Sequence, residues 1–112
     1  MNYDLAIIGA GPGGTDAAEL AAAHGLKVIL FEKNKLGGVC LNEGCIPTKT
    51  LLRSAHLLSE ALEGKKYGVT IPEASFELSK VMSRKTKILK KLGAGIRLGL
   101  QNHGVEIVTE EA

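Results

Sequence analysis

The stretch that decides the fold is LAIIGAGPGG, residues 5–14 of a 112-residue chain. It begins within an apolar run, residues 3–8, that predicts a short buried strand. The GxGxxG turn follows, and residues 16–24, rich in alanine and leucine, predict a helix. Residues 27–31 predict a second strand that ends at Glu32. This order within about 30 residues predicts the β-α-β unit of a Rossmann-like, dinucleotide-binding α/β fold.

The glycines of the turn each have a physical task in such a unit. Gly9 makes the tight turn, Gly11 lets the backbone approach a pyrophosphate, and Gly14 lets the helix pack on the strand. Helix amides beyond the turn face the phosphates, and Glu32 accepts hydrogen bonds from ribose hydroxyls. A glycine-rich turn without a ligand is the alternative, which the flanking strand, helix and acid disfavour. NAD and FAD both satisfy these features, whereas Glu32 would repel a 2′-phosphate.

The chain has two cysteines, Cys40 and Cys45, with four residues between them. On an ideal helix their Cα atoms would lie about 8 Å apart, beyond disulfide reach, so a redox pair requires a loop or a distorted turn. Nearby glycines permit one, and Pro47 suits the start of a helix. The N-terminus of that helix would favour a thiolate at Cys45, which leaves Cys40 as the expected exposed sulfur.

Two inert, buried thiols are the alternative, and cysteines in small α/β domains usually have that fate. A zinc site is disfavoured because CxxC is the commoner spacing. The three histidines are also scattered, at His24, His56 and His103. Lys49 supports the redox interpretation, because it lies one helical turn after Cys45 and its ammonium suits a thiolate or a reduced cofactor.

The run from Leu36 to Lys49, with its CLNxGCIPTK core, resembles the redox-active disulfide segment of the pyridine nucleotide-disulfide oxidoreductases. Within that family it is most similar to the dihydrolipoyl dehydrogenases. Glutathione and mercuric reductases are similar too, but valine is expected there in place of Leu41 and Ile46. The resemblance implies FAD in this first unit, NAD as acceptor in a homodimeric full-length enzyme, and dihydrolipoamide on an acyltransferase of a 2-oxoacid dehydrogenase complex as substrate.

The resemblance also implies roles for individual residues. Cys40 would exchange disulfide with the substrate, Cys45 would face the flavin, and Lys49 would stabilise charge near the flavin N5. No metal ligand is expected. The residues expected at the cofactor are Gly9, Gly11, Pro12, Gly13, Gly14, Glu32, Lys33, Gly38, Val39, Cys40, Cys45 and Lys49.

Residues 1–112 are expected to form only the N-terminal portion of the FAD-binding domain, an incomplete unit with parallel strands and long helices. In the resembled family a nicotinamide domain and an interface domain follow, and the latter supplies a His-Glu acid-base pair from the partner subunit. We therefore expect the isolated chain to lack NAD-linked turnover and to self-associate. A free-standing nucleotide-binding or redox module without turnover is the alternative.

The second half of the chain predicts two helices and a strand. Leucines at helical spacing predict a helix over residues 48–63 and, after an extended link, Ser75 is predicted to cap a helix that continues to about His103. Glycines 93, 95 and 99 predict that this helix is either broken or closely packed there. Residues 105–109 predict a third strand, parallel to the second.

The last helix carries seven of the fourteen basic residues, although the net charge of the chain is only +2. A face for nucleic acid or another partner is one interpretation. A solvated polar face is preferred, because aromatic residues for stacking are absent. No signal peptide or membrane-spanning segment is evident, so a cytoplasmic protein without nucleic-acid or membrane partners is expected.

Overall fold

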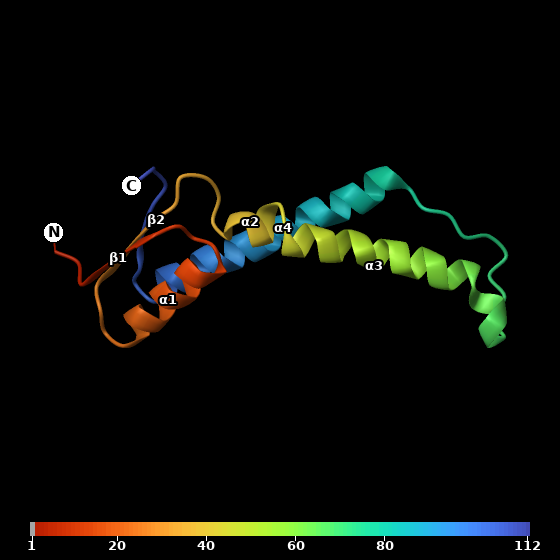
Figure 1. Ribbon diagram of the computed structural model, residues 1–112, viewed down its shortest axis with the longest axis horizontal. Helices are drawn as coiled ribbons and strands as arrows, with labels where there is room; N and C mark the ends of the chain where they lie inside the picture. The colour runs from red at the N-terminus through yellow and green to blue at the C-terminus, as the bar shows by residue number, and fades with distance from the viewer. Residues whose placement is uncertain (1) are drawn as a thin grey trace.

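The computed structural model describes residues 2–112 and places a parallel sheet at one end of a long helical arm (Figure 1). The predicted α/β fold is confirmed. The elements in chain order are β1 (Leu5–Ile8), α1 (Pro12–Ala23), β2 (Val28–Phe31), α2 (Gly38–Asn42), α3 (Cys45–Leu62), the 3₁₀ helix η1 (Gly64–Tyr67), α4 (Leu78–Asn102) and β3 (Glu106–Val108).

The sheet has the strand order β1-β2-β3, and both neighbouring pairs are parallel. Leu30 of β2 lies between Ile7 of β1 and Ile107 of β3, so these three side chains share one face. Each strand is shorter than predicted. Asp4 and Lys27 directly precede β1 and β2 and are joined by a polar contact. The Asp4 carboxylate accepts a hydrogen bond from the Lys27 backbone N–H at 2.8 Å.

The core lies between one face of the sheet and two helices, α1 and the C-terminal part of α4. Leu30 and Leu100 are fully buried there. The buried residues of this core are Ala10, Ala18, Val28, Leu30, Leu36, Leu100 and Val105. The end of β1 is open by contrast, since Ile8 is 79% exposed. Packing on the covered face of the sheet fixes the positions of the strands and of the glycine turn that follows β1.

Helix α1 begins at Pro12, four residues before the predicted start at Asp16. Proline suits this position because its φ is already helical and its missing N–H has no partner to lose at a helix start. The Thr15 N–H donates to the Gly11 carbonyl at 3.0 Å, so the first helical turn closes directly on the glycine turn.

Helix α4 begins at Leu78, so the prediction that Ser75 caps it is wrong. Glu77 occupies the cap position instead, where its carbonyl accepts hydrogen bonds from the N–H groups of Lys80 and Val81, both at 3.1 Å. Its carboxylate also accepts from the Ser79 hydroxyl and pairs with Lys80. Helix α4 thus begins directly after Glu77, and no side chain bonds the free N–H groups of its first turn.

The glycines of α4 do not break it, and α4 packs against both α1 and α2. A Cβ at Gly99 would lie 2.5 Å from Glu19 Oε1 of α1, so the missing side chain leaves room for this carboxylate. A Cβ at Gly93 would be in ordinary contact with the Leu41 side chain of α2, at 3.9 Å. Helix α4 therefore contacts both α2, which carries Cys40, and strand β3 of the sheet.

Helices α3 and α4 run side by side away from the sheet, and the loop that joins them lies at the far end of the arm (Figure 1). The molecule measures 64 × 25 × 17 Å, with a radius of gyration of 19.5 Å. A compact domain of this length would have a radius of gyration of about 13 Å. None of the helices in the described residues combines the length and apolar character needed to span a membrane.

Candidate functional site: a glycine turn joined to a thiol pair

The glycine turn connects β1 to α1 through a conformation that only glycine adopts without strain. Gly9 has φ of +100°, and its N–H donates to the Phe31 carbonyl at 2.8 Å. A Cβ at Gly14 would collide with the Gly9 carbonyl oxygen. The two glycines therefore produce the sharp turn and the close helix-strand contact expected from the sequence.

The outer side of this turn is open and presents the start of α1. A Cβ at Gly11 or Gly13 would meet nothing within 4 Å. Helix α1 has no side-chain cap at its N-terminus and no acidic residue in its first turn. The free N–H groups and the helix dipole thus face an unobstructed space, which is the arrangement that binds phosphate groups.

Glu32 lies at the end of β2 and holds the turn from the side. Its carboxylate accepts hydrogen bonds from the N–H groups of Ala10, at 2.8 Å, and Asn34, at 2.9 Å. The sequence indicated only a ribose acceptor here. The structure adds a second task, because the same side chain fixes the backbone of the glycine turn.

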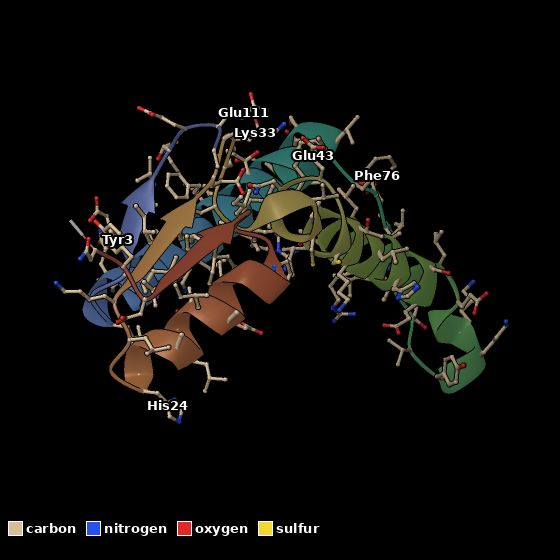
Figure 2. The ribbon with its side chains drawn as sticks, turned by 60° about the vertical axis from the view of Figure 1, so that its left-hand side comes forward. Tyr3, His24, Lys33, Glu43, Phe76 and Glu111 are labelled. Carbon is tan, nitrogen blue, oxygen red and sulfur yellow. The ribbon has the colours of Figure 1, made fainter. Side chains whose placement is uncertain are left out.

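A cleft of about 210 Å³ opens at the carboxyl ends of β1 and β2. In parallel α/β sheets, ligands bind at this edge. Lys33 lies at its rim and pairs with Glu111 at 3.5 Å (Figure 2). The cleft is lined by Ile8, Gly9, Phe31, Glu32, Lys33, Glu110, Glu111 and Ala112.

The two cysteines lie on either side of a break between two helices. Cys40 is in α2, Gly44 interrupts the helical path, and Cys45 is the first residue of α3. A Cβ at Gly44 would lie 3.3 Å from the Cys40 Cα, so glycine permits the close approach. The distorted turn predicted for a thiol pair is therefore present, and α3 starts at Cys45 rather than at the predicted Thr48.

The two thiols are close enough to affect each other's ionisation. A hydrogen bond to Cys45 raises the pKa of the Cys40 thiol above its usual range, and partial burial and the charge on Cys45 act in the same direction. The nearby Lys49 ammonium opposes this rise. Lys49 therefore lies close enough to act on the thiol pair.

The predicted order of exposure is reversed. Cys45 is exposed and Cys40 is only partly exposed, although Cys40 was expected to be the accessible sulfur. The reason is the packing of α2: Leu41 is buried, with α4 against it, so the turn that carries Cys40 is drawn inward. Cys45 is the first residue of α3 and is exposed to solvent. Val39 and Lys49 are exposed as well.

The glycine turn and the thiol turn are in direct contact. The Gly37 N–H donates to the Ala10 carbonyl at 2.7 Å, and a Cβ at Gly38 would lie 2.8 Å from the Gly11 Cα. Ala10 is therefore held by Glu32 at its N–H and by Gly37 at its carbonyl. Two motifs that are separate in sequence form one site.

Two polar residues of the site were not assigned from the sequence. Thr15 is buried, and its hydroxyl donates to the carbonyls of Gly11 and Pro12 at 3.1 and 3.3 Å. Asn42 donates from its side chain to the carbonyls of Leu36 and Gly38, at 3.1 and 2.9 Å. Asparagine beside glycines in a turn often bonds the local backbone, which was the available signal for Asn42.

In residues 2–112, no three His, Cys, Asp or Glu side chains gather in a way that could hold a metal ion. His24 and His103 each make a local hydrogen bond through Nδ1, to the carbonyls of Leu20 and Gly99, both at 2.8 Å.

Comparison with known proteins agrees with this geometry. The model of the family described as pyridine nucleotide-disulphide oxidoreductase matches residues 3–112. The dihydrolipoyl dehydrogenase of Chlorobaculum parvum is 47% identical over 98% of this chain and 24% of its own length. Those of Mycoplasma genitalium and Acholeplasma laidlawii are 44% and 45% identical over 100% and 94% of this chain.

The chain spans 24% to 32% of the length of these three relatives. The matched region includes both the glycine turn and the thiol pair, which the structure brings into one site. The chain belongs to the pyridine nucleotide-disulphide oxidoreductase family.

Proposed function

We propose that residues 1–112 form the N-terminal part of the FAD-binding domain of a dihydrolipoyl dehydrogenase. The observation that carries the proposal is the Gly37 N–H bond to the Ala10 carbonyl, which holds the thiol segment against the phosphate-binding type of turn. This contact would bring a cofactor gripped by the glycine turn close to Cys40 and Cys45. The names of the relatives favour dihydrolipoamide over glutathione or mercuric ion as substrate.

FAD fits the residues of the site. The turn would hold the diphosphate through the backbone N–H groups of Gly11, Gly13 and Gly14, because the space beside Gly11 and Gly13 is open. Pro12 would contribute no N–H but fixes the first turn of the helix. Glu32 and Lys33 line the cleft where the ribose would lie. Bound FAD would supply a two-electron acceptor beside the thiols. Gly38, Val39 and Lys49 would complete the wall of the site around Cys40 and Cys45.

The chain's own residues would carry out thiol-disulfide exchange with the substrate. A thiolate of dihydrolipoamide would attack Cys40 in the Cys40–Cys45 disulfide, which breaks the S–S bond and leaves a mixed disulfide with Cys40 and a free Cys45. The second substrate thiol would then displace Cys40. The products are lipoamide, which is oxidised by two electrons, and two reduced cysteines.

In the complete protein we propose that these electrons pass on to NAD⁺, in a homodimer that serves an acyltransferase of a 2-oxoacid dehydrogenase complex. The isolated chain is expected to show no lipoamide-dependent NADH formation. The residues that we assign bind FAD and exchange disulfides, and none of them would bind NAD⁺ or act as the acid-base pair. NADH production by the 112 residues alone would contradict this assignment.

The proposal can be tested with the 112-residue chain and oxidised lipoamide. Wild-type chain should form an intramolecular Cys40–Cys45 disulfide, detected by mass spectrometry after thiol trapping. In the Cys45→Ser variant no disulfide should form within the chain, and alkylation of the free lipoyl thiol as it appears should trap the lipoyl group as a mixed disulfide on Cys40. Without this trapping, the free lipoyl thiol would displace Cys40 and close the lipoyl ring again. Absence of both products would overturn the proposed thiol chemistry.

Cofactor choice needs a separate measurement. Titration with FAD, followed by quenching of flavin fluorescence, should give weak but saturable binding. NAD should bind less well in calorimetry under the same conditions. The Gly11→Val variant should lose FAD binding while circular dichroism shows intact helices, since its side chain would enter the open space above the turn. Equal or tighter binding of NAD would contradict the assignment to FAD.

We also propose that copies of the chain self-associate. Large apolar side chains are exposed on several elements, including Val39 at 70%, Leu57 at 57% and Leu62 at 68%. Exposed apolar surface of this kind favours association. Sedimentation equilibrium should show dimers or larger species as the concentration rises, and a strict monomer at high concentration would contradict this.

A further inference from the structure

Asn42 lies between the two cysteines and is tied to the backbone on the far side of Cys40. Its side-chain NH₂ group donates to the Leu36 carbonyl at 3.1 Å and to the Gly38 carbonyl at 2.9 Å. Both bonds are partly buried. One side chain therefore connects the end of α2 to its beginning and to the loop before it.

Helix α2 is short, and this connection adds to the contacts that Gly37 and Gly38 make with the glycine turn. It contains five residues, it has no side-chain cap at its N-terminus, and Gly37 precedes it in a left-handed conformation with φ of +99°. The Leu41 N–H reaches the Gly37 carbonyl only at 3.4 Å. Helices of this length are not stable by themselves. Packing of Leu41 holds the apolar side of the turn, and Asn42 holds its polar side.

Cys40 lies inside the loop that Asn42 closes. The tie points, Leu36 and Gly38, precede Cys40, and Asn42 follows it by two residues. On the other side, Gly44 permits the chain to return so that Cys45 meets Cys40. The backbone between the two cysteines is thus constrained at Asn42 and at Gly44.

We propose that Asn42 is a positioning residue that sets the equilibrium between the dithiol and disulfide forms of Cys40 and Cys45. The proposal rests on the proposed function only in taking the pair as redox-active. By holding the Cys40 turn, Asn42 keeps one sulfur at a high effective concentration near the other, which favours the disulfide. Without the two bonds the turn opens more often, and the dithiol form gains.

The reaction to be measured is exchange with oxidised dithiothreitol, a cyclic disulfide. Cys40 and Cys45 each lose the S–H proton, one S–S bond forms between them, and the reagent's S–S bond is reduced to two thiols. Two electrons pass from the protein to the reagent, and two protons end on the reagent's sulfur atoms. Mixtures of oxidised and reduced reagent set the ratio, and thiol trapping followed by mass spectrometry reads it.

The Asn42→Ala variant is expected to lower the equilibrium constant for disulfide formation by about tenfold. This corresponds to a potential that is about 30 mV less negative. Asn42→Ser keeps one donor and should give a smaller shift in the same direction. The matched control is Asn102→Ala, at an exposed asparagine at the end of α4, and it should leave the constant unchanged.

A purely structural role for Asn42 would give a different result. It would lower the urea midpoint of the dithiol and disulfide forms equally and leave the exchange constant at the wild-type value, and that outcome overturns the proposal. If circular dichroism shows that Asn42→Ala does not fold, the test uses Asn42→Ser instead. A wild-type exchange constant in Asn42→Ser would also overturn the proposal. Failure of the wild-type chain to form the disulfide at any ratio would instead refute the proposed function.

Discussion

Replacing Gly38 by alanine tests whether the glycine turn and the thiol turn are packed as one unit. Gly38 has φ of +64°, a left-handed conformation that costs other residues about 1–2 kcal/mol. The new Cβ would lie 2.8 Å from Gly11 Cα and 3.3 Å from Gly11 N. These are backbone atoms that cannot rotate away, and forcing a methyl group into packed space costs about 1–3 kcal/mol. The expected total loss is about 2–5 kcal/mol.

The control for this prediction is Gly104→Ala. Gly104 has φ of +77°, close to that of Gly38, but a Cβ there would meet nothing within 4 Å. Its expected cost is therefore conformational strain alone, about 1–2 kcal/mol. Urea denaturation followed by circular dichroism gives both values, and the difference measures the contact with Gly11. Equal losses for the two variants would refute a tight contact between the turns.

Three further predictions concern the core, the acid and the thiols. Leu30→Ala should destabilise the chain by about 2–5 kcal/mol in the urea assay, because Leu30 is fully buried in the central strand. Its control is Leu62→Ala, at a side chain that is 68% exposed, which should change the free energy of unfolding by no more than about 0.5 kcal/mol. Glu32→Ala should cost about 1.5–3 kcal/mol because two backbone N–H groups lose their acceptor, and a loss no greater than that of the exposed Glu43→Ala would contradict this. Cys45→Ala should lower the pKa of Cys40, since the hydrogen bond to Cys45 is the main cause of its rise. The alkylation profile of Cys40 should then move to lower pH, and an unmoved profile would show that the thiols do not interact.

The sign of the last effect also predicts how stability depends on pH. The pKa of Cys40 is raised in the folded chain, so its interaction with Cys45 stabilises the fold fully below the unfolded pKa of a cysteine, 9.0. This stabilisation is lost as the pH rises through the folded value. The wild-type chain should therefore lose more stability than Cys45→Ala on going above pH 9.

The sheet and its connections could be predicted from the sequence because their signals are local. An apolar run, a glycine turn and an acid at the right spacing specify the first β-α-β unit, and the third strand follows from its own apolar run. The start of α4 could not be predicted in the same way. Ser75 has a favourable residue type for a cap, but the helix begins after Glu77, with no side-chain capping bond, so the cap preference of single residues was not a sufficient signal.

The candidate site shows the same division. The distorted turn around the cysteines was predictable from the spacing and the glycines. The relative exposure of Cys40 and Cys45 was not, because it depends on the burial of Leu41 against a helix some fifty residues later in the chain. The two hydrogen bonds of the Ala10 backbone, to Glu32 and from Gly37, could not be predicted either, since both join residues more than twenty positions apart.

The long arm formed by α3 and α4 has a practical consequence in solution. A particle with a radius of gyration of 19.5 Å, against about 13 Å for a compact chain of equal length, meets more friction as it diffuses. On a size-exclusion column a single copy would elute early, at the volume of a considerably heavier sphere. Molar mass should therefore be taken from light scattering, because calibration with globular standards would overestimate the mass of a single copy.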